Sequence, residues 1–272
     1  MSSSLATTPT LYIEGPALWA PTLPGWDVAR AAFRGEGAPA DPPVKRPAPQ
    51  VLAPAERRRA PDSVAIALEV AAAAVAAAGR QAVDLPCVFA SAHGDLAIND
   101  YMCATLASEP TLLSPTKFHN SVHNAAVGYW TIGTGCMASS NSVSSFEATF
   151  AAGLLEAAAQ CACDAQAVLL TGFDVQAVGP LASAVHSKGM LAAAMVIAPQ
   201  RSERSVAAFE WSLATGPAQP LALQSDAARA LQGNSLADAL PLYEALACGG
   251  DAQLALPLSE RLALRLSLRA LS

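Results

Sequence analysis

Residues 139–163 read SSNSVSSFEATFAAGLLEAAAQCAC, a run of mostly small residues followed by a long stretch suited to a helix. Residues 139–145 predict a short strand, and residues 146–163, with no proline and one glycine, predict a helix. Glu147 therefore lies at a strand-to-helix junction. Free N–H groups and the positive end of the helix dipole favour negative charge there.

Strands and helices alternate on both sides of this junction, which predicts a layered α/β domain. Strands are expected over residues 11–14, 86–91, 167–173, 190–198 and 205–215, with a last strand or hairpin over 254–268. Helices are expected over residues 64–78 (capped by Asp62-Ser63 and closed by Gly79), 97–108, from about 120 onward, and 235–247. Residues between the first strand and Trp26 are broken by proline and glycine.

Residues 35–61 contain seven prolines and predict a loop, because proline interrupts both helices and strand ladders. A basic run, Glu56-Arg57-Arg58-Arg59, lies inside it. Two interpretations of this run stay open: a solvated turn before a helix, and a docking patch for an acidic partner.

The composition excludes several classes of protein. The 272 residues carry a net charge of −6, and 14% of them are charged, against about 25% in typical soluble domains. Disorder, a coiled coil, a disulfide scaffold and a basic nucleic-acid binder are poor fits. So few charges on an apolar chain indicate that another subunit covers part of the surface.

The cysteines and the apolar runs give no sign of export, metal binding or membrane insertion. The six cysteines lack the paired spacing of a zinc site, and we expect free thiols in the cytoplasm. The start of the chain does not resemble a signal peptide. The most apolar run, residues 64–79, is shorter than the ~20 residues that span a bilayer.

Several short motifs remain ambiguous. Residues 114–117 match a Ser-x-x-Lys string, but Pro115 suits a loop and no partner motif follows. His119 and His123 are spaced for one helix face, which leaves metal binding, loop hydrogen bonds and site lining as alternatives. A polar turn at His93, Asp95 and Asp100 fits either a cation site or, better, an ordinary hydrogen-bonded turn.

Four segments carry a resemblance to a known family: residues 88–96 (VFASAHGDL), 113–118 (LSPTKF), 121–128 (SVHNAAVG) and 142–149 (SVSSFEAT). They resemble β-ketoacyl synthases, and in particular the short chain-length-factor proteins of aryl-polyene and xanthomonadin-type pigment clusters. The last segment is similar to the Ser-Ile-Ser-Thr-Ala-Cys-Ala-Thr stretch around the ketosynthase nucleophile. In that alignment the cysteine falls on Glu147.

The resemblance implies half of a thiolase-like α/β fold, a mixed sheet packed by helices, in one domain over residues 1–272. Its core would span about residues 10–200, and residues 201–272 would form reduced C-terminal strands and a helix. It implies no cofactor and no metal. The residues it offers as site lining are His93, His119, His123, Asn124, Ser142 and Ser144.

The departures from the family imply a non-catalytic subunit. Glu147 replaces the cysteine, and His186 is the only histidine after His123, so the family's histidine pair is incomplete. The resemblance therefore implies a heterodimer with a full-length ketosynthase that works on acyl carrier protein, contacted through residues around 118–146. This chain would wall off the acyl tunnel and set the chain length.

Two other hypotheses remain. In the first, the chain is an acyltransferase or thioesterase-like enzyme that uses Ser142, Ser144 or Cys136 with His93, His119 or His123. Alternatively, it is a dimerisation scaffold without a tunnel. For Glu147 itself, the sequence leaves two interpretations open: an ordinary residue in the first turn of a helix, or a residue that fills the nucleophile position.

Overall fold

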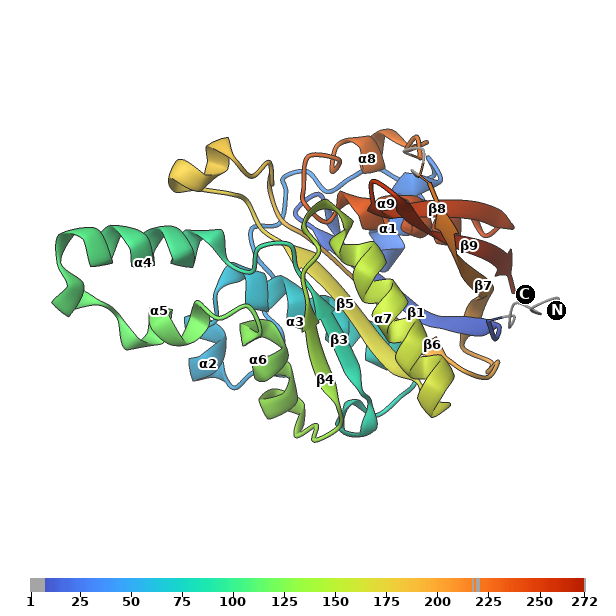
Figure 1. The fold of residues 1–272 in the computed structure, drawn as a ribbon, viewed down its shortest axis with the longest axis horizontal. Coiled ribbons are helices and arrows are strands. Elements are labelled where there is room, and N and C mark those ends of the chain that lie inside the picture. The colour runs from blue at the N-terminus through green and yellow to red at the C-terminus, as the bar shows by residue number, and fades with distance from the viewer. Residues whose placement is uncertain (1–7, 217, 219–220, 272) are drawn as a thin grey trace.

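The structure is a computed structural model that describes residues 8–216, 218 and 221–271. The described residues form a sheet of nine strands in the order β4-β3-β5-β6-β1-β7-β9-β8, with β2 paired to β1 (Figure 1). The strands are β1 Leu11–Ala20, β2 Leu23–Pro24, β3 Cys87–Ala90, β4 Ser140–Val143, β5 Val168–Asp174, β6 Leu191–Ala198, β7 Ser205–Thr215, β8 Ala252–Ser259 and β9 Leu262–Ala270.

The sheet is mixed, as expected. β3 pairs in parallel with both β4 and β5, whereas the other strand pairs are antiparallel. The carboxyl ends of β3, β4 and β5 therefore meet at one end of the sheet. The loops that leave these three strands are brought together there.

Helices cover both faces of the sheet. The helices are α1 Trp26–Phe33, α2 Pro54–Arg59, α3 Asp62–Ala77, α4 Leu96–Ser108, α5 Pro115–Asn120, α6 Ala125–Thr134, α7 Thr149–Asp164, α8 Asp226–Arg229 and α9 Leu240–Cys248. Short 3-10 turns occupy Ala82–Asp84, Pro110–Leu112, Phe146–Ala148, Gly179–Ser183 and Ala237–Ala239. One core lies under α7, α1 and α9, and a second lies under α3 and α6.

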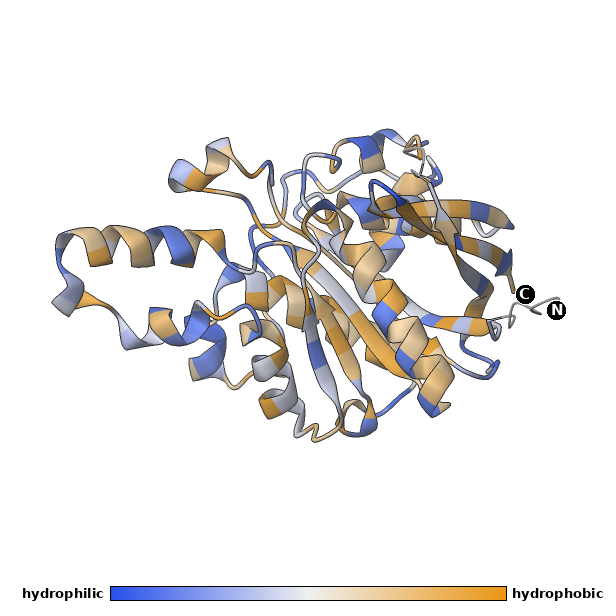
Figure 2. Cartoon of the chain, in the orientation of Figure 1, coloured by the Kyte–Doolittle hydropathy of each residue, from blue (hydrophilic) through white to orange (hydrophobic). Residues whose placement is uncertain are grey.

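Alternating side chains of the central strands supply the two cores. In β6, Leu191, Ala193 and Met195 face the α7 side. Ala192, Ala194 and Val196 face the α3 side. Both faces of this strand are buried, which explains why its sequence is continuously apolar (Figure 2).

The first strand is longer than the sequence predicts. β1 continues past Glu14 through Gly15 and Pro16 to Ala20, with a register shift between Glu14 and Ala17. Gly15 has φ 54°, and a Cβ there would lie 2.2 Å from the carbonyl oxygen of Ala74 on α3. Glycine thus lets β1 bend beneath α3 instead of ending the strand.

Two short helices were not predicted from the sequence. α1 follows the proline- and glycine-broken approach, and α2 occupies part of the expected loop 35–61. Pro54 is the first residue of α2, where a missing N–H costs no helical hydrogen bond. The prediction of a loop, which rested on the number of prolines, is therefore wrong for residues 54–59.

Several predicted boundaries also shift. α3 begins at Asp62 itself, and the expected cap is absent, because the Ser63 hydroxyl donates to Asp95 across 2.8 Å. The helix expected from about residue 120 begins at Ala125 as α6, and an additional short helix, α5, ends at Asn120 before it. α4 and α5 form an arm that projects from the body of the molecule (Figure 1).

The C-terminal residues complete the sheet. β7 has the boundaries predicted for residues 205–215, and β8 and β9 form the expected hairpin at the other end of the sheet from β4. The helix predicted from residue 235 begins only at Leu240, after the turn Ala237–Ala239. Among the described residues, no helix is both long and apolar enough to cross a bilayer.

Candidate functional site

The junction between β4 and α7 is a sharp turn. Phe146 has φ 53°, a left-handed backbone conformation that side-chain-bearing residues rarely adopt. The Thr149 hydroxyl braces the turn: it donates to the carbonyl of Phe146 at 2.7 Å and accepts from the N–H of Ser145 at 3.0 Å. Because of this turn α7 begins at Thr149, three residues later than the sequence predicts.

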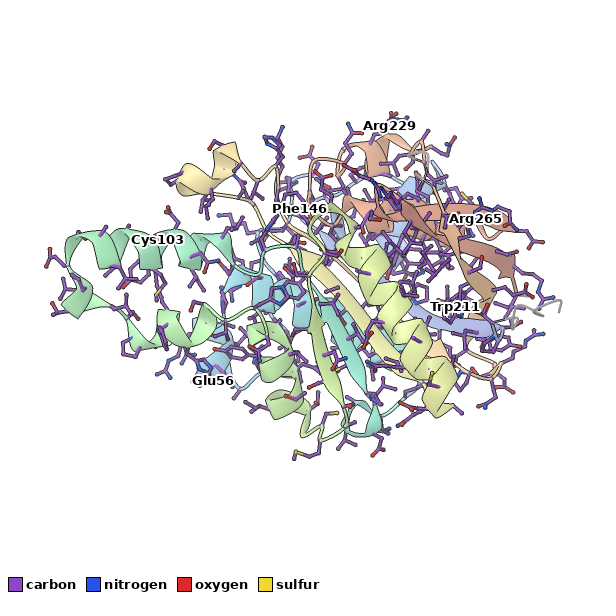
Figure 3. All side chains as sticks on the ribbon, in the orientation of Figure 1. Glu56, Cys103, Phe146, Trp211, Arg229 and Arg265 are labelled. Atoms are coloured by element: carbon purple, nitrogen blue, oxygen red, sulfur yellow. The ribbon has the colours of Figure 1, made fainter. Side chains whose placement is uncertain are left out.

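The first two residues of the turn, Phe146 and Glu147, have exposed side chains. Phe146 is 57% exposed and projects near the start of α7 (Figure 3). Its ring meets His93 edge to face, with 5.6 Å between centroids. Glu147 is exposed, and its carboxylate has no hydrogen bond or ion pair with any described residue.

A polar cavity of about 500 Å³ opens beside the turn. Its walls come from the turn itself, from the loop before β6 and from residues 232–238. The charged and polar side chains that line it are His93, Glu147, His186, Lys188, Gln232, Asn234, Ser235 and Asp238. The Glu147 carboxylate and the Lys188 ammonium share this cavity without forming an ion pair.

A different carboxylate occupies the amino terminus of α7. The N–H of Ala151 donates to Oδ2 of Asp238 at 3.0 Å. Burial raises the pKa of Asp238 to about 7. The other carboxylate oxygen of Asp238 is buried and has no hydrogen-bond partner among the described residues. The sequence pointed to Glu147 as the group in the field of the helix, and the structure puts Asp238 against the helix.

Asp174 organises the carboxyl ends of β3 and β5. Its carboxylate, 1% exposed, accepts hydrogen bonds at 2.9 Å from the Ser91 hydroxyl and from the N–H of Ala92. Burial raises the pKa of Asp174 to about 7, although these hydrogen bonds act in the opposite direction. Sequence reasoning missed this residue. The available signal was an acidic residue at the end of a continuously apolar strand.

The four histidines do not form one cluster. His93 lines the polar cavity, and burial and the nearby His123 lower its pKa. His123 contacts the carbonyl of Ser91 through Nε2 at 2.7 Å. His119 points to a separate groove, where it meets the Tyr129 ring. Within the described part of the chain, no three His, Cys, Asp or Glu side chains are placed to hold a metal ion.

The candidate nucleophiles are not paired with histidine. Ser142 lies exposed on β4. The Ser144 hydroxyl donates to the carbonyl of Ala92 at 3.0 Å. The thiol of Cys136 is buried and contacts the carbonyl of Leu85 at 3.5 Å. A serine or cysteine enzyme needs a nucleophile within hydrogen-bond reach of its base, and none of these three makes that contact.

An apolar groove of about 640 Å³ lies between α2 and the α5–α6 region. Phe118, Val122 and Ile132 line it and are 58%, 50% and 82% exposed. Asn124 and His119 also lie along it. Nearby, Met137 is 94% exposed, and β4 is an edge strand with an open side. The face made by α5 and α6 is therefore unusually apolar for a surface, whereas the exposed residues of the neighbouring β4 are polar.

The sequence of the chain was compared with known protein families and with curated proteins. The sequence model of the family "Beta-ketoacyl synthase, N-terminal domain" matches residues 31–255. No curated protein sequence gives a significant match.

Solved structures match over almost the whole chain. "Ketosynthase (ApeO) in Complex with its Chain Length Factor (ApeC) from Xenorhabdus doucetiae" has a TM-score of 0.71 at 22% identity and covers 95% of this chain and 99% of the matched chain. "The ishigamide ketosynthase/chain length factor" has a TM-score of 0.72 at 15% identity, with 97% and 100% covered. A ketosynthase from Burkholderia phymatum STM815 has a TM-score of 0.60 at 14% identity, with 89% and 78% covered.

The chain therefore shares its overall fold with solved ketosynthase structures. The chain belongs to the β-ketoacyl synthase N-terminal domain family and has its thiolase-like α/β fold.

Proposed function

We propose that this chain is a non-catalytic, chain-length-factor-like subunit that pairs with a complete β-ketoacyl synthase. The observation that carries the proposal is Glu147 at the turn between β4 and α7, where the family places its cysteine. A condensing enzyme needs a thioester that passes its acyl group to a carbanion. A carboxylate is a poor substitute for the thiolate that forms that thioester.

The remaining histidines support the absence of condensing chemistry. His93 and His186 line the polar cavity beside Glu147, but no histidine follows His186 in the sequence. Among the described residues after β6, no histidine is present that could form the family's pair. The partner subunit would therefore supply both the cysteine and the histidines.

The exposed apolar face supports a large partner interface. The groove lined by Phe118, Val122 and Ile132 runs along α6, and α6 contacts the edge strand β4. Obligate interfaces commonly bury about 2,000 Å² or more and are rich in apolar side chains. Two matched structures are named as a ketosynthase with its chain length factor, which supports a ketosynthase as the partner of this chain.

The acyl carrier protein is the other proposed partner. A further matched structure is described as a type II PKS acyl-carrier protein in complex with its ketosynthase, with a TM-score of 0.72 at 11% identity. On this chain, Arg58 and Arg59 are exposed on α2, beside the apolar groove. We infer that they attract an acidic carrier protein, and that the complex works in the cytoplasm on a fatty-acid- or polyene-type chain.

The acyltransferase or thioesterase hypothesis has no support in the geometry. Ser144 and Cys136 already contact backbone carbonyls, and Ser142 lies on the open edge of the sheet. A scaffold without a tunnel differs from the proposed function in its effect on the product, so product length separates the two.

The test is co-expression with the ketosynthase encoded beside this chain. Size-exclusion chromatography with light scattering should give a one-to-one complex that survives high salt, because apolar contacts are little screened. Ile132→Asp should abolish the complex. Leu213→Asp, which changes a 52% exposed leucine on β7, is the matched control and should leave it intact.

Activity completes the test. The chain alone should form no diketide from malonyl- and acyl-carrier-protein substrates, whereas the complex should. The product of the complex should differ in length from that of the ketosynthase alone, whereas a scaffold without a tunnel would leave its length unchanged. A stable monomer that ignores every neighbouring ketosynthase, or diketide formation by the chain alone, would overturn the proposed function.

A further inference from the structure

The amino terminus of α7 lacks a cap from its own sequence. Ala148 occupies the N-cap position and offers no side-chain acceptor. The first N–H groups of a helix have no partners within the helix, and they concentrate partial positive charge at its start. In an enzyme with a cysteine at this turn, such a terminus lowers the pKa of the thiol.

Asp238 supplies the missing acceptor from a distant part of the chain. Its Oδ2 accepts from the N–H of Ala151 at 3.0 Å, although the two residues lie 87 positions apart. Its other oxygen, Oδ1, is buried without a hydrogen-bond partner among the described residues. The carboxyl group therefore faces the helix terminus and the cavity that also contains Glu147.

The segment that carries Asp238 is fixed to the sheet. The Asn234 amide donates to the carbonyl of Lys188 at 3.0 Å and accepts from the N–H of Leu236 at 3.0 Å. Leu236 is fully buried against Gly172 of β5, where a Cβ would lie 2.7 Å from Cδ1 of Leu236. Rigid contacts on both sides keep the Asp238 carboxylate at the start of α7.

Other titratable groups lie around Asp238. Asp174, at the end of β5 and outside the lining of the cavity, adds to the effect of burial and raises the pKa of Asp238 further. The remaining titratable groups of the cavity are His93, Glu147, His186 and Lys188. Among them Asp238 is the one that contacts a free N–H of α7.

We propose that Asp238 is a second disabling residue of this subunit: its carboxylate takes the helix-terminal position that would otherwise stabilise an anion at residue 147. The inference deepens the proposed non-catalytic function, because it explains why one substitution at position 147 would not restore a reactive thiol. Asp238 acts here as a positioning residue, through the helix terminus, and not by contact with substrate.

The test introduces the missing cysteine and follows its ionisation. Glu147→Cys is compared with Glu147→Cys/Asp238→Asn, and alkylation of the introduced thiol by iodoacetamide is measured against pH by peptide mass spectrometry. Asparagine keeps an oxygen that can accept from Ala151, so the fold should persist. The exposed Cys103 on the α4–α5 arm reports the behaviour of an ordinary thiol in the same samples (Figure 3).

In the single variant, the thiol introduced at position 147 should titrate no lower than a free thiol, at about 8.5. In the double variant its pKa should fall by about one pH unit or more, which corresponds to a roughly tenfold faster alkylation at neutral pH. The matched control is Glu147→Cys/Asp164→Asn, which removes the same charge from the exposed carboxyl end of α7 and should leave the pH profile of the introduced thiol unchanged.

Two results would overturn the inference: a low pKa of the introduced thiol in the single variant, or the same pKa with and without Asp238. If the asparagine variant fails to fold, Asp238→Ser gives a second neutral side chain, and the single variant remains decisive by itself. The measurement uses this chain alone, so its failure is separate from a failure to bind a ketosynthase.

Discussion

Asp174 makes the stability of the chain fall as pH rises. In the unfolded chain this carboxyl group titrates at its ordinary value of 3.8, whereas burial raises its pKa in the folded chain to about 7. The folded state therefore binds the proton more tightly. The stability from this proton is fully present below pH 3.8 and is lost as pH rises through about 7.

The size of the effect follows from the two pKa values. Their difference of about three pH units corresponds to about 4 kcal/mol, of which roughly 2.5 kcal/mol is lost between about pH 5 and pH 8. Asp238, whose pKa is also about 7, contributes in the same direction. His93 opposes them weakly, because its lowered pKa makes the folded state release a proton that the unfolded chain still binds.

Urea unfolding of the wild type and Asp174→Asn across this pH range measures the effect. The free energy of unfolding of the wild type should fall with pH, and the asparagine variant should show a clearly shallower dependence. Asp226→Asn, which changes an exposed side chain on α8, is the control and should reproduce the wild-type slope.

Ser91→Ala tests the cause independently. It removes the 2.9 Å hydrogen bond that favours the charged form of Asp174, so it should steepen the loss of stability with pH. Equal slopes for the wild type and Asp174→Asn, or a wild type that gains stability from about pH 5 to pH 8, would refute the assignment of a buried, protonated carboxyl group.

Three further predictions concern the fold, the interface and the thiols. Gly15→Ala should destabilise the chain by about 3 kcal/mol or more, since its Cβ would lie 2.2 Å from the Ala74 carbonyl at a positive φ; a thermal midpoint within a degree or two of the wild type would contradict this. Ser142→Trp should leave the melting temperature of the chain alone unchanged, because Ser142 is exposed on β4, but it should prevent co-purification with the ketosynthase by overfilling the interface; a normal complex would place the interface elsewhere. A thiol reagent should label the exposed Cys103, Cys163 and Cys248 quickly in the folded chain, and the buried Cys87, Cys136 and Cys161 only on unfolding. The number of labelled thiols is measured by absorbance, and rapid labelling of more than three thiols in the folded chain would contradict the prediction.

The sequence alone determined the local elements with strong patterns. The buried strands β3 and β6 are continuous apolar runs, and β7 was predicted with its observed boundaries. The small-residue strand before a long helix located the turn at Glu147, and four short segments in order identified the family. These features depend on residues close together in the chain, so periodicity and motif spacing are sufficient to predict them.

The short helices α1 and α2 could not be predicted in the same way. Isolated helices of six or eight residues are unstable, so packing against the rest of the protein decides whether they form. The bend at Gly15 similarly depends on the approach of α3, which the local sequence does not reveal.

The charged groups of the site are the clearest case of tertiary control. Glu147 was visible as a substituted motif position, but Asp174 and Asp238 lie outside any motif. Asp238 meets Ala151 across 87 residues because the C-terminal segment folds back over the start of α7. A carboxyl group acquires its partners and its pKa from the atoms around it. The sequence therefore located the turn, and only the tertiary structure decided which carboxylate lies at the helix terminus.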